Sequence, residues 1–275
     1  MKIGLALGGG GARGAAHVGV LMELEAHGIR PHLITGTSIG GLVGALYAAG
    51  LSTADLAHFF AELNLTHLYG LPGGAPAFAG NNKIEKLLEQ TLGRITFADL
   101  QIPLAVVTVD LVSRKTVILD EGDLITAVLA TIALPIVLPP IEWEGMALVD
   151  GGLLNNVPFD IARARGATYV IAVALERTTP YGAPVELPPL EGGVLERALA
   201  LTQRRRTWQI LSVVADIITG SSLHMRLAIS QPDLLLQPHM GTIGLFDFHR
   251  WQAALEKGRA AAHEVEAELR AIGGG

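Results

Sequence analysis

A serine stands between two glycines in the pentapeptide Gly36-Thr37-Ser38-Ile39-Gly40, where a predicted strand meets a predicted helix. A nucleophilic serine needs a sharp turn of this kind, because its hydroxyl must stand clear of the backbone. Gly36 and Gly40 leave room for the turn, since side chains there would crowd the neighbouring backbone. The N-terminus of the helix that follows Ser38 also favours negative charge near the serine hydroxyl. The alternative is a plain tight turn before a tightly packed helix.

A run of glycines, Gly8-Gly9-Gly10-Gly11-Ala12-Arg13-Gly14, lies earlier in the chain, after a predicted strand and before a predicted helix. Its successive amides could converge on an anion. One interpretation is an oxyanion hole facing a carbonyl that Ser38 attacks, because the glycine loop and the serine turn end adjacent strands at one sheet edge. The other is a Rossmann phosphate loop, which requires an acidic residue near the end of the second strand. Residues 32–36 contain none.

A catalytic serine also needs a base. In ordinary α/β hydrolases the order is serine, acid, then histidine, and His17, His239 and His249 are the candidates for that histidine. Asp150 is an alternative base, because it ends a predicted strand and is followed by two glycines. A carboxylate held there could accept the Ser38 proton directly. Aspartate that only caps a turn is the competing explanation.

Together the three motifs resemble the patatin-like phospholipase family, which includes plant patatins and the catalytic domain of neuropathy target esterase. GGGGARG resembles the family's oxyanion loop, GTSIG its nucleophile elbow and DGG its D-G-[AG] motif, in the same order. HVGVL, ALPIVLPP and NNVP are further matches, so the resemblance extends from Ile3 to about Val173. One departure is Ile136, where the family usually has a small residue.

The resemblance implies a mechanism and a set of site residues. A Ser38–Asp150 dyad hydrolyses carboxylic esters of lipids through an acyl-enzyme, without a catalytic histidine, metal or cofactor. Asp150 is a weak base, so we expect it to be buried, with a raised pKa. The implied oxyanion hole uses backbone amides of Gly9, Gly10, Gly11 and Ala12. The implied supporting residues are Arg13, Gly14, Gly36, Gly40, Gly151 and Gly152.

Short apolar runs alternate with longer helical patterns, which favours an α/β fold with a mostly parallel central sheet flanked by helices. The resemblance implies its three-layer sandwich form. We expect a catalytic core at 1–175, a loop at 176–193, where prolines and glycines concentrate, and a helical C-terminal part of the same domain at 194–275. The predicted strands are Ile3–Leu7, one beginning at His32–Ile34, Leu104–Val109, Lys115–Leu119, Met146–Val149, Thr168–Ala174 and Leu234–Leu236. The predicted helices are Ala15–His27, Gly40–Ala49, Ser52–Leu63, Asn82–Leu92, Leu124–Ala133, Val194–Ile218 and Trp251–Ala271.

Composition excludes several classes of function. The 275 residues carry a formal net charge of -6, which argues against nucleic-acid partners, and the lack of cysteine excludes disulfides and thiol chemistry. The first residues lack a signal-peptide pattern, and prolines interrupt the longest uncharged run, Leu124–Ile141. We therefore expect a cytoplasmic protein. Its mean hydropathy of +0.42 is high, which indicates peripheral contact with the inner face of a membrane.

Several segments bear on how a lipid would enter. The segment Tyr69–Gly80, rich in glycine and proline, is the predicted lid. The apolar segments Leu51–Leu71 and Leu124–Ile141 are expected either to line a channel for the acyl chain or to belong to the hydrophobic core. Leu195–Leu227 combines arginines with apolar residues, as in a helix on an anionic membrane or a solvated packing helix. A Rossmann-like nucleotide-binding module and a catalytically silent lipid-binding protein are the alternative functions. The oligomeric state is not predicted.

Overall fold

The computed structural model describes residues 1–63, 81–176 and 196–274. In this part of the chain, eight strands form a central sheet in the order β5-β6-β3-β2-β1-β7-β8, and β4 pairs with β3. β3, β2, β1, β7 and β8 are parallel neighbours, whereas β4, β5 and β6 pair antiparallel. The strands are β1 (Ile3–Leu7), β2 (Leu33–Thr37), β3 (Leu104–Asp110), β4 (Lys115–Leu119), β5 (Ile141–Trp143), β6 (Met146–Asp150), β7 (Tyr169–Val173) and β8 (Leu234–Leu236).

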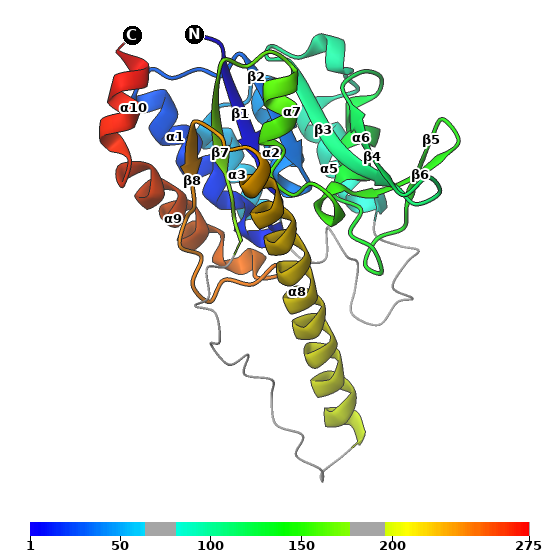
Figure 1. The fold of residues 1–275 in the computed structure, drawn as a ribbon. Coiled ribbons are helices and arrows are strands. Elements are labelled where there is room, and N and C mark those ends of the chain that lie inside the picture. The colour runs from blue at the N-terminus through cyan, green and yellow to red at the C-terminus, as the bar shows by residue number, and fades with distance from the viewer. Residues whose placement is uncertain (64–80, 177–195, 275) are drawn as a thin grey trace.

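Helices cover both faces of this sheet, which confirms the predicted α/β class (Figure 1). In β1, Leu5 and Leu7 join the larger of two buried hydrophobic clusters and Ala6 joins the smaller, as the alternation of a pleated strand requires. The helices are α1 (Ala15–Ala26), α2 (Ile39–Ala48), α3 (Thr53–Glu62), α5 (Asn81–Leu92), α6 (Leu124–Thr131), α7 (Phe159–Ala164), α8 (Glu196–Ile229), α9 (Trp251–His263) and α10 (Glu266–Gly273).

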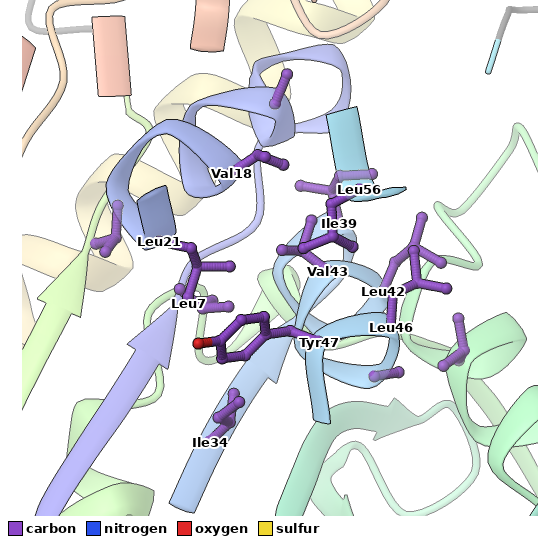
Figure 2. Close-up of a cluster of buried hydrophobic side chains, with 14 of the residues drawn as sticks. Leu7, Val18, Leu21, Ile34, Ile39, Leu42, Val43, Leu46, Tyr47 and Leu56 are labelled. Carbon is purple, nitrogen blue, oxygen red and sulfur yellow. The ribbon is translucent and has the colours of Figure 1, made fainter. Parts of the chain in front are cut away.

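α2 is buried along its whole length, in contrast to a surface helix with one polar face. Figure 2 shows its side chains, among them Ile39 and Tyr47, packed with Leu7 of β1 and Ile34 of β2. Gly40 permits this contact, because a Cβ there would lie 2.2 Å from the carbonyl oxygen of Leu7. The helix that begins after Ser38 is therefore held rigidly against the strands.

The C-terminal segment differs from the prediction in one respect. Instead of a single helix over Trp251–Ala271, the chain forms α9 and α10, because Val265 between them adopts a non-helical backbone with φ −118° and ψ 28°. Val265 packs against the larger hydrophobic cluster. α9 packs directly on α1, since a Cβ on Gly258 would lie 1.9 Å from the carbonyl oxygen of Ala16. The end of the chain thus contributes to the same core as its beginning.

α8 and β5 also depart from expectation. α8 continues past Ile218 to Ile229, because Leu223 beyond that point is buried in the smaller hydrophobic cluster and holds the helix on the body. β5 was not among the predicted strands. It pairs with β6 through a two-residue hairpin turn in which Glu144 and Gly145 both have positive φ. The predicted lid at Tyr69–Gly80 and residues 177–193 of the predicted loop lie outside the described residues.

Candidate active site

The sheet brings Ser38 and Asp150 together. β4 pairs with β3 over Val106–Asp110 and so occupies one edge of that strand; β2 and β6 must therefore share the other. On that shared edge, Thr37 of β2 is in register with Val107 and Asp150 of β6 with Thr108. Because β6 runs antiparallel to β3, its last residue meets the end of β2, where Ser38 follows.

The backbone of Ser38 has φ 54° and ψ −127°, a conformation that residues other than glycine rarely adopt. Strain of this kind costs on the order of 1–3 kcal/mol and persists only where the surroundings impose it. Here the Ser38 amide donates to the hydroxyl of Thr131 (2.9 Å), which in turn donates to the carbonyl of Val107 (2.6 Å). Gly36 closes the turn, because a Cβ there would lie 2.6 Å from the carbonyl oxygen of Gly40.

Asp150 is buried, with 6% of its surface exposed. Burial raises its pKa to about 6, although hydrogen bonds from the Ser38 hydroxyl and from the amide of Gly152 (2.8 Å) oppose the rise. Gly151 is required at the turn, because a Cβ there would lie 2.3 Å from the carbonyl oxygen of Val107. A carboxylate with this pKa is mostly ionised at neutral pH and accepts a proton more readily than an exposed one.

Four amides of the glycine loop are predicted to form the oxyanion hole, and two of them already donate to backbone carbonyls elsewhere in the protein. The amide of Gly9 donates to the carbonyl of Asn156 (3.1 Å), and that of Ala12 donates to the carbonyl of Leu245 (2.8 Å). Within the described part of the chain, the amides of Gly10 and Gly11 donate to no protein acceptor. Of the four predicted amides, those of Gly10 and Gly11 therefore remain available to donate to a bound oxygen. Gly9 and Ala12 shape the loop instead.

Arg13 is one of the supporting residues that the resemblance implies, and its contacts anchor the glycine loop. The side chain is 1% exposed and donates through Nε to the carbonyl of Ile243 (2.9 Å). Its two terminal nitrogens bind both carboxylate oxygens of Asp216 on α8, at 2.7 and 2.9 Å, which neutralises the charge. Gly14 completes the loop, because a Cβ there would lie 2.1 Å from Cγ1 of Ile39.

Two polar residues of the site were not assigned a role from the sequence. The side-chain amide of Asn156 donates to Oε1 of Glu176 (2.7 Å) and, more weakly, to the carbonyl of Gly9 (3.4 Å). Burial raises the pKa of Glu176. The NNVP motif contains Asn156 and marks it as a site residue. No local pattern marks Glu176, which follows an apolar strand by three positions.

The three candidate histidines are not placed to serve Ser38. His17 is buried, and its Nε2 donates to the carbonyl of Gly8 (2.7 Å); burial lowers its pKa to about 4. His239 and His249 are exposed. None of the three lines the cavity that contains Ser38. Asp150 is therefore the base that this geometry supports.

Ser38 and Asp150 line a cavity of about 180 Å³ whose other walls are mostly apolar. Residues of the Leu124–Ile141 segment, such as Ile132 and Leu134, contribute to it, whereas none of the described residues 51–63 does. Ile136 also lines it, with 80% of its surface exposed and a φ of 73°. Left-handed φ favours glycine, which gives a physical reason for a small residue at this position.

Comparison with known proteins agrees with this architecture. The profile of the family described as patatin-like phospholipase matches residues 5–163. An uncharacterised NTE family protein of Mycobacterium tuberculosis is 32% identical over 95% of this chain and 46% of its own length. Patatin-like phospholipase domain-containing protein 6 of Mus musculus is 38% identical over 62% of this chain and 13% of its own length. The chain thus spans at most about half the length of these relatives.

The fold has a counterpart among solved structures. The crystal structure of VipD from Legionella pneumophila superposes with a TM-score of 0.64, covering 98% of this chain and 67% of that one, at 14% identity. At this identity the likeness concerns the fold. The profile match covers more than half of the sequence, including the glycine loop, the serine turn and the aspartate. The chain therefore belongs to the patatin-like phospholipase family.

Proposed function

We propose that this chain is a lipid-acyl hydrolase in which Ser38 is the nucleophile and Asp150 is its base. The observation that carries the proposal is that Ser38 lines the same largely apolar cavity as the buried carboxyl of Asp150, whose pKa is raised by burial. Family membership supports hydrolysis of lipid acyl esters. The cavity supports an apolar acyl chain as the group that is bound.

The first step forms an acyl-enzyme. Ser38 Oγ bonds to the ester carbonyl carbon as Asp150 takes the hydroxyl proton, and the carbonyl oxygen becomes an oxyanion. The free amides of Gly10 and Gly11 donate to that oxyanion. Donors of this kind are each worth on the order of 3 kcal/mol in the transition state. Asp150 then returns the proton to the leaving alcohol as the carbon–oxygen bond breaks.

The second step releases the acid. Water attacks the acyl-enzyme carbonyl, Asp150 takes a proton from that water, and Ser38 Oγ leaves and recovers the proton. The same two amides stabilise the second oxyanion. The ester, the dyad, the loop amides and water together account for every bond and proton in both steps.

The test is hydrolysis of p-nitrophenyl esters of increasing acyl length by the wild type, Ser38→Ala and Asp150→Asn. Matched controls are Ser52→Ala and Asp99→Asn, which alter an exposed serine and an exposed aspartate at helix caps. Circular dichroism checks that every variant is folded. We expect both dyad variants to lose at least a thousandfold in kcat, while the controls keep wild-type turnover.

The outcomes separate the rival functions. Full activity in Asp150→Asn would place the base elsewhere. Lipid binding without turnover in the wild type would indicate a catalytically silent lipid-binding protein. A thermal shift with a dinucleotide, again without turnover, would favour the nucleotide-binding alternative.

A further inference from the structure

We propose that the exposed face of α8 docks on the surface of an anionic phospholipid bilayer and holds the mouth of the Ser38 cavity against it. This inference rests on the proposed lipid-acyl hydrolase function and adds the route by which substrate arrives. α8 is the long helix that extends beyond the rest of the fold in Figure 1.

The face in question is an apolar stripe at helical spacing. Its members are between 38% and 86% exposed. Several large apolar side chains exposed on one face of a helix are uncommon on a soluble protein and mark an interaction site. We call it the α8 stripe, and it consists of Ile210, Val214, Ile217, Ile218, Met225 and Ile229.

The stripe is continuous with the cavity. Val214 and Ile218 are exposed on α8 and also line the cavity that contains Ser38. Ile136, from a different segment, is likewise both exposed and part of the lining. An acyl chain could therefore pass from a bilayer to Ser38 along apolar surface, without crossing water. This continuity identifies lipid as the occupant of the stripe.

The charges of α8 favour an anionic surface. Asp216 is the sole acidic residue in the described stretch 210–229, and it is paired with Arg13. In sequence, positions 196–209 of the same helix contain one glutamate and four arginines: Glu196, Arg197, Arg204, Arg205 and Arg206. An arginine-rich sequence that adjoins an apolar helical stretch is typical of helices that bind anionic lipid.

Contacts with the body indicate that α8 lies on the bilayer and does not cross it. Ile210–Ile229 is long and apolar enough to span a membrane by length and composition. However, Ser222 donates to the carbonyl of Leu154 (2.9 Å), and Arg226 binds Asp160 (2.6 Å). Together with the Arg13–Asp216 pair, these contacts hold one side of the helix on the protein and leave only the stripe for lipid.

The experiment measures co-sedimentation of the protein with vesicles of phosphatidylcholine alone or mixed with phosphatidylglycerol. The test variant is Ile217→Ser/Met225→Ser, which removes two stripe side chains that do not line the cavity. The matched control is Leu111→Ser/Val112→Ser, which removes two exposed apolar side chains between β3 and β4. Neither variant changes net charge. Circular dichroism checks folding, and turnover of p-nitrophenyl acetate reports on the catalytic site.

We expect the wild type to bind the mixed vesicles at least tenfold more tightly than the neutral ones. The stripe variant should lose at least tenfold of that affinity and keep acetate turnover, and the control should match the wild type. Unchanged vesicle binding by the stripe variant would overturn the proposal. So would a wild-type dimer that the variant converts to monomer, because the stripe would then bind a second copy. Vesicle binding without any ester turnover would refute the proposed function and not the docking.

Discussion

Replacing Asp150 with asparagine should inactivate the protein and, at the same time, stabilise its fold. Burial raises the pKa of Asp150 from 3.8 to about 6, so the native state holds the proton more tightly than the unfolded chain does. The stability due to this proton is fully present below the unfolded pKa and is lost as pH rises through the folded pKa. Above that range the wild type keeps an ionised carboxylate in a site that disfavours it.

The magnitude follows from the shift of about two pKa units. At about 1.4 kcal/mol per unit, the buried charge lowers the free energy of unfolding by about 3 kcal/mol near pH 8 and by about 0.5 kcal/mol near pH 4. Asparagine has no charge to bury, and its side-chain oxygen still accepts the hydrogen bond from the Gly152 amide. The free energy of unfolding of Asp150→Asn should therefore exceed that of the wild type by up to about 3 kcal/mol near pH 8 and by little near pH 4.

Urea unfolding followed by circular dichroism, at both pH values, measures this difference. Asp110→Asn is the matched control, because hydrogen bonds from Ser113 and the amides of Val112 and Ala147 lower the pKa of Asp110 to about 2. That substitution should destabilise the protein near pH 8, the opposite sign. If Asp150→Asn is no more stable than the wild type near pH 8, or is stabilised equally at both pH values, the reasoning from burial is wrong.

Other measurements test the dyad and its supports. Wild-type ester turnover should fall tenfold per pH unit below about pH 6, since protonated Asp150 cannot accept a proton; a pH–rate profile that stays level there would contradict the role of Asp150. Arg13→Ala should lower the free energy of unfolding by about 3 kcal/mol in urea, because it leaves Asp216 without its partner. Thr131→Val should reduce kcat about tenfold with little change in KM, because the Ser38 amide loses its acceptor; a raised KM with unchanged kcat would point to a binding defect. Ile136→Gly should raise the melting temperature, since relief of about 1–2 kcal/mol of left-handed strain exceeds the ~0.5–1 kcal/mol entropy cost of glycine; a lower melting temperature would show that the side chain contributes packing.

The local parts of this protein could be predicted from its sequence. β2, the serine turn and α2 are contiguous in sequence. Gly36 and Gly40 on either side of Ser38 permit the turn, because a Cβ at either position would clash with neighbouring backbone. Most strands and helices followed from apolar periodicity, which is itself a local property. Asp150 could be singled out because it ends a strand before two glycines, and the resemblance to a family then linked it to Ser38.

The tertiary structure alone decided how these parts meet. The Ser38–Asp150 contact depends on β2 and β6 sharing one edge of β3, and strand order is not written in any short segment. Likewise, the free amides of the loop could be told from the bonded ones only after Asn156 and Leu245 were placed beside it. Periodicity indicates that a helix has an apolar side, but not whether protein or solvent meets it; packing against the sheet buried α2 completely and left the α8 stripe exposed. Hydrogen-bond partners and burial are long-range properties of the folded chain, whereas backbone preferences belong to neighbouring residues.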